Sequence, residues 1–127
     1  MIEIGVSFEK EIVVTEEMLA NVVDKDLPPV YSTPSMIALM ELTSGELMKK
    51  FLTEEQGSVG MTVNVKHISA TPCGKAVKCE SKVLNVDGKK VEFEVNAYDD
   101  KGLIGTGTHK RARKKIDFPV LFGKQLI

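Results

Sequence analysis

Alternating apolar and polar positions predict that most of this chain is β-structure. Segment 4–14 has the pattern of a strand, with its apolar residues bounded by Gly5 and Thr15. The second half of the chain predicts four further strands, at 59–67, 75–86, 91–97 and 103–115. Asp87-Gly88 is a strong signal for a two-residue hairpin, so we expect tight turns and antiparallel pairing there.

One long helix is expected between the first strand and the others. Ser32 or Thr33 can cap it, and Pro34 suits its first position, where the missing N–H costs nothing. The helix should run to about Leu52, after an irregular segment at 24–31 that contains two adjacent prolines. Its first half, MIALMEL, has a single charge, so we expect it to be buried.

The order of these elements predicts an α+β fold. An antiparallel sheet of about five strands, twisted and wrapped around one long central helix, would bury the apolar faces of both. The length of 127 residues suits a single domain, and residues 1–127 contain neither an internal repeat nor a linker.

Composition and charge favour a soluble globular protein. With 43% hydrophobic residues, 28% charged residues and a net charge of -1, the chain has no overall field to attract nucleic acid or an anionic membrane. Cys73 and Cys79 are too few and too close for a disulfide framework, which suits a reducing compartment. The N-terminus lacks the apolar core of a secretory signal, and no apolar stretch is long enough for a membrane span. We therefore expect a cytoplasmic protein with no nucleic-acid or membrane partner.

Two ionisable residues lie within apolar patterns. His67 continues the apolar alternation of 59–65, so it should point toward the helix, either as a satisfied core histidine or as a catalytic base. Glu41 lies in the apolar half of the helix, where Ala38 and Gly45 leave room beside its carboxylate. Glu41 is either paired with a backbone or hydroxyl partner, exposed at an edge of the helix, or available for catalysis.

Thr33 has two interpretations. It can simply cap the helix, or its hydroxyl can be a nucleophile or hold the attacking water, with His67 or Glu41 as the base. We assign no catalytic role to His109, which lies in the last predicted strand. Two separated histidines and two unspaced cysteines do not match a metal-ligand set, and no phosphate-binding glycine motif is present.

Three segments carry a family resemblance. VYSTPSMIALMEL, SVGMTVNVKHISATPCGKAV and GTGTHKRA together are similar to the fluoroacetyl-CoA-thioesterase-like family of hotdog-fold thioesterases. The resemblance implies a catalytic constellation of Thr33, Glu41 and His67, with the backbone amide of Gly60 against the thioester carbonyl. Fluoroacetyl specificity is not implied, because DKDLPPV, the stretch before the helix, lacks the phenylalanines of the fluoroacetyl-specific enzyme.

The resemblance leads us to expect an acyl-CoA thioesterase that hydrolyses a small acyl-CoA thioester to free acid and CoA. His67 would act as base for Thr33 or water, Glu41 would orient the imidazole or activate the water, and the Gly60 N–H would stabilise the oxyanion. We expect no cofactor apart from the coenzyme A carried by the substrate. Alternatives are a non-catalytic acyl-CoA-binding module and a hotdog hydratase or dehydratase; the latter is disfavoured because no aspartate precedes His67 at the required spacing.

A basic run and an edge strand suggest the remaining contacts. Lys110 and Arg111 begin the basic run, which either keeps an exposed strand soluble or binds the phosphates of coenzyme A. No aromatic residues interleave with these charges, which disfavours nucleic-acid binding. An open hotdog sheet leaves an edge uncovered, and the family that this chain resembles covers that edge in a two-fold dimer whose sheets join. The resemblance therefore leads us to expect a homodimer with the active site at its interface.

Overall fold

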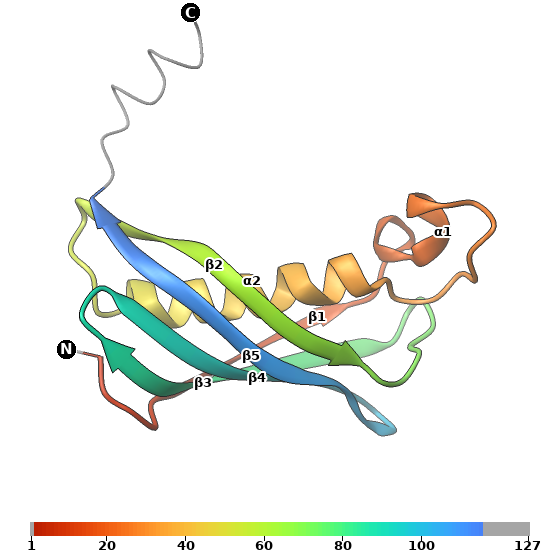
Figure 1. The fold of residues 1–127 in the computed structure, drawn as a ribbon. Helices are drawn as coiled ribbons and strands as arrows, with labels where there is room; N and C mark the ends of the chain where they lie inside the picture. Colours follow the sequence, from red (N-terminus) through yellow and green to blue (C-terminus); the bar gives the residue numbers. More distant parts are fainter. Residues whose placement is uncertain (1, 116–127) are drawn as a thin grey trace, which may run out of the picture.

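The computed structural model describes residues 2–115, which form one antiparallel sheet and one long helix. The elements are β1 (Ser7–Val13), η1 (Glu16–Met18), α1 (Ala20–Val23), α2 (Thr33–Lys49), β2 (Gln56–His67), β3 (Ala76–Asp87), β4 (Lys90–Asp99) and β5 (Gly102–Lys115). The five strands lie in the order β1-β3-β4-β5-β2, and the twisted sheet wraps along α2 (Figure 1). The predicted α+β architecture is confirmed.

The start of α2 differs from the prediction in one respect that matters for the site. Ser32 is the N-cap, because its hydroxyl accepts a hydrogen bond of 3.1 Å from the backbone N–H of Ser35. Thr33 is therefore the first helical residue, and its hydroxyl is free for other contacts. No helix in the described part of the chain is both long enough and apolar enough to cross a membrane.

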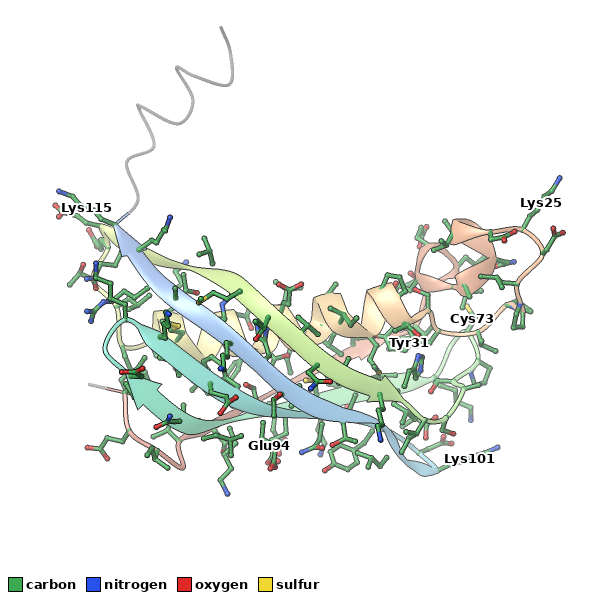
Figure 2. The ribbon with its side chains drawn as sticks, in the orientation of Figure 1. Lys25, Tyr31, Cys73, Glu94, Lys101 and Lys115 are labelled. Atoms are coloured by element: carbon green, nitrogen blue, oxygen red, sulfur yellow. The ribbon has the colours of Figure 1, made fainter. Side chains whose placement is uncertain are left out.

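The core lies between one face of α2 and the inner face of the sheet. The helix residues buried there are Met36, Leu39, Met40, Thr43, Ser44, Leu47 and Met48. Ser44 is satisfied by a 2.7 Å contact between its Oγ and that of Ser81 on β3. Burial raises the pKa of the Cys79 thiol to about 11, so it remains protonated at neutral pH. On the sheet, inward residues alternate with outward ones such as Glu94 (Figure 2).

Edge strand β2 departs from the predicted pattern. Val59, Met61 and Val63 were expected to face the helix, but they remain 44%, 45% and 39% exposed. A register shift between Gly60 and Thr62 interrupts the alternation of side chains, and within residues 2–115 the only strand that pairs with β2 is β5. An exposed apolar strip therefore lies along an open sheet edge.

Candidate active site

Thr33 and His67 form the first group of polar residues. The Thr33 Oγ1 lies 2.8 Å from the His67 Nδ1, which joins the start of α2 to the end of β2. The ring of Tyr31 stands edge-on to the imidazole, with centroids 6.4 Å apart, and the Tyr31 hydroxyl donates to the carbonyl of Ser35 at 3.2 Å. A cavity of about 300 Å³ opens beside this pair. The structure thus brings together two of the three residues that the family resemblance implied, while their catalytic roles stay a prediction.

The second ring nitrogen of His67, Nε2, makes no hydrogen bond within the described residues. This nitrogen atom is buried. Desolvation lowers the pKa of His67, partly offset by the backbone of Ser69. The imidazole is therefore neutral at neutral pH, which is the form that accepts a proton from a hydroxyl group.

This lowered pKa predicts the pH dependence of any reaction that uses His67 as base. A histidine with a lowered pKa stays neutral down to lower pH, so the acid limb of kcat/KM should fall at an apparent pKa below the ordinary histidine value of 6.5. The pH profile of kcat/KM measures this directly. An acid limb above 6.5 would contradict the assignment.

Glu41 and Arg111 belong to a second group, near the middle of α2. The Glu41 Oε2 lies 3.9 Å from the Arg111 Nη1, with side-chain exposures of 41% and 12% respectively. Glu41 is thus half-exposed, and it lines a cavity of about 580 Å³ together with Ala38 and Gly45. The predicted space beside this carboxylate is present.

Contacts on all sides fix the guanidinium of Arg111. Its Nε donates to the Ser58 Oγ at 2.9 Å and its Nη2 donates to the Ser58 carbonyl at 3.1 Å. Its Nη1 donates to the His109 Nε2 at 3.2 Å and approaches the Glu41 carbonyl at 3.5 Å. These contacts leave Arg111 few free donors for coenzyme A phosphates. Its neighbour Lys110 is exposed and, by strand alternation, points to the other face of the sheet. A phosphate-binding role for either residue stays a prediction.

Gly60 lies against the Glu41 carboxylate. A Cβ atom added to Gly60 would be 2.6 Å from the Glu41 Oε2, far closer than van der Waals contact. Only glycine therefore lets this carboxylate lie over the backbone of β2.

We expect Gly60→Ala to displace Glu41 while the fold persists, because the atom in collision is the end of a flexible side chain. The kcat of the protein should fall about tenfold or more, since small displacements of reacting groups cost rate steeply. Steady-state kinetics beside a melting curve would test this. An unchanged kcat would show that the position of Glu41 is immaterial.

The two groups are well separated within one chain. Gly60 and His67 are seven positions apart on β2, or about 23 Å at the rise of a regular strand. Thr33 and Glu41 are eight positions apart on α2, or about 12 Å. Within one chain Glu41 therefore lies apart from the His67 imidazole, and its expected role, to orient that imidazole or to activate the water, stays a prediction. No cluster within residues 2–115 has three or more residues that could hold a metal ion.

Comparison with models of known protein families shows the family of this chain. The model of the fluoroacetyl-CoA-specific thioesterase family matches residues 14–114. The chain belongs to this family. Fluoroacetyl-CoA thioesterase from Streptantibioticus cattleyicolor is 36% identical over 87 residues, which cover 68% of this chain and 63% of that relative.

Solved structures of thioesterases share the fold. The fluoroacetyl-CoA thioesterase FlK superposes with a TM-score of 0.91 at 27% identity, covering 100% of this chain and 98% of that one. A variant of FlK was solved with fluoroacetate and CoA (TM-score 0.85, 29% identity, 91% and 97% coverage). A thioesterase superfamily member from Thermus thermophilus gives 0.88 at 27% identity, with 99% and 93% coverage. The predicted hotdog fold is confirmed.

His109, to which the sequence assigned no catalytic role, belongs to the second group of polar residues. It is buried to 1% exposure beside Arg111, on the face of β5 that is turned toward α2. The spacing contained a usable signal, because residues two apart on a strand share a face. The side chains of His109 and Arg111 could therefore have been expected on the same face of the last strand, next to each other.

Proposed function

We propose that this protein hydrolyses a small acyl-CoA thioester to the free acid and CoA. The observation that carries the proposal is the 2.8 Å contact between the Thr33 hydroxyl and an imidazole that burial keeps neutral. A hydroxyl needs an adjacent base to become a nucleophile, and His67 supplies one. Membership of a thioesterase family supports the same chemistry.

The reaction can proceed from this pair in two ways. In one, His67 takes the Thr33 proton while the hydroxyl oxygen attacks the thioester carbonyl; CoA leaves as thiol after receiving the proton, and water then hydrolyses the acyl-threonine. In the other, Thr33 and His67 hold a water that attacks directly. In both, the backbone N–H of Gly60 is assigned to the developing oxyanion, a role that backbone donors perform without reorganisation.

The proposed site is completed by a second copy of the chain. We propose a homodimer in which the open edge of β2 pairs antiparallel with β2 of its partner, burying the exposed Val59, Met61 and Val63. A two-fold axis between positions 63 and 64 would place Gly60 of one copy opposite His67 of the other. Glu41, which lies against Gly60, would then approach the unpartnered Nε2 of the other copy's His67.

Release of free thiol from a panel of acyl-CoAs tests the proposed activity. The panel should contain short, branched and aryl acyl groups together with fluoroacetyl-CoA, since the loop before α2 has no phenylalanine. Turnover of one or more small acyl-CoAs is expected. Saturable binding without any turnover would instead identify a non-catalytic acyl-CoA-binding module.

A further inference from the structure

His109 makes two hydrogen bonds that together determine its chemical form. Its Nδ1 lies 2.8 Å from the carbonyl oxygen of Thr62, and its Nε2 lies 3.2 Å from the Arg111 Nη1. A carbonyl oxygen only accepts hydrogen bonds, and a guanidinium only donates them. One form satisfies both contacts: a neutral imidazole with its proton on Nδ1.

The surroundings of His109 favour that neutral form. The ring is buried and stacks on Phe93 with centroids 6.3 Å apart. Desolvation lowers the pKa of His109; the Thr62 carbonyl and Glu41 act in the opposite direction, whereas the Arg111 charge lowers it further. An imidazolium would also direct an N–H at the guanidinium, which has no lone pair to accept it.

The carbonyl that anchors His109 lies at the irregular point of β2. Thr62 follows directly after the register shift, and Gly60, on the other side of the shift, pairs with Arg111. His109 therefore ties the guanidinium to the segment of β2 against which Glu41 lies.

We propose that His109 is a positioning residue: as a neutral hydrogen-bond acceptor it holds Arg111 against Glu41, and so keeps the Glu41 carboxylate beside Gly60. His109 contacts neither Thr33 nor His67, so it acts through Arg111. Its effect on turnover rests on the proposed thioesterase activity, whereas its hydrogen-bonding form does not.

Two amide substitutions separate the two contacts of His109. The amide group of glutamine reaches the place of Nε2 and can accept from Arg111, whereas that of asparagine reaches only the place of Nδ1. We expect His109→Asn to lower kcat about tenfold to a hundredfold with little change in KM, and His109→Gln to restore much of that loss. Both variants leave space in the core, so a merely structural role would make their activities fall alike with their melting temperatures.

A double-mutant cycle tests the route through Arg111. If His109 acts by holding the guanidinium, His109→Asn should cause no further loss of kcat in the Arg111→Ala background. Additive losses in the double variant would overturn the proposal.

Nitrogen-15 NMR of the histidine rings provides a test that needs no enzymatic activity. At neutral pH His109 should be neutral with its proton on Nδ1, and it should gain a second proton only below the ordinary histidine value of 6.5. A pKa of His109 above 6.5, or a proton on Nε2 in the neutral ring, would overturn the inference even in an active thioesterase. If the spectrum is as expected but the protein hydrolyses no acyl-CoA, the proposed function is refuted. The assigned hydrogen-bonding form of His109 would still hold in that case.

Discussion

Replacing His67 by alanine will lower kcat/KM for acyl-CoA hydrolysis by about a thousandfold. His67 is the base within reach of the Thr33 hydroxyl, at 2.8 Å, and general base catalysis typically contributes about 10² to 10⁴ in rate. The loss should appear mainly in kcat, because a proton is transferred in the transition state and not on binding. Thiol-release kinetics over a range of substrate concentrations would measure both constants.

Lys66→Ala provides the matched control for His67→Ala. Lys66 precedes His67 on β2 but is exposed, and by strand alternation it points to the opposite face. The Lys66→Ala substitution should leave kcat/KM within about twofold of the native value, since surface substitutions seldom disturb a fold. A folded His67→Ala protein with activity within tenfold of native would contradict the proposed role of His67.

Most of the fold followed from local signals in the sequence. Pro34 indicated the start of α2 to within one residue, since the helix begins at Thr33. Asp87-Gly88 likewise indicated the β3–β4 turn to within one residue: Asp87 pairs with Lys90, and the two loop residues are Gly88, with a φ of +61°, and Lys89. The helix ended at Lys49, three residues before the predicted end, because 50–52 continue as a tighter turn with i to i−3 hydrogen bonds. Whether the last turn of a helix tightens in this way depends on which residues pack against it. The spacing of apolar residues in the sequence does not reveal this packing.

The pairing of Thr33 with His67 could be expected from the family resemblance, but other parts of the site depended on tertiary structure. Two adjacent hydroxyl residues could cap α2, and only the geometry shows that Ser32 does so and leaves Thr33 free. The alternation of apolar residues in β2 placed Val59 on the covered face, because a register shift has no clear signature in sequence. The contacts of Arg111 likewise depend on which face of β5 is covered.

Mixing two inactive variants should restore activity if each site is shared between two chains. His67→Ala removes the base on one side of the proposed interface, and Glu41→Gln removes the carboxylate on the other. In the proposed dimer each site takes His67 from one chain and Glu41 from the other. In a mixed dimer one site would therefore carry both substitutions, and the other site would carry neither. Refolding the two variants together in equal amounts makes about half of the dimers mixed, so about a quarter of native activity should return.

A second mixture shows whether restored activity comes from the shared site. Thr33 and His67 belong to the same chain and hydrogen bond to each other, so mixing Thr33→Val with His67→Ala leaves one defect in every site of a mixed dimer. This mixture should stay inactive, whereas His67→Ala with Glu41→Gln recovers. If the mixture of His67→Ala with Glu41→Gln also stays inactive, or if light scattering shows a stable monomer, the β2-paired dimer is ruled out. Glu41 would then have to act within its own chain, about 12 Å along α2 from Thr33.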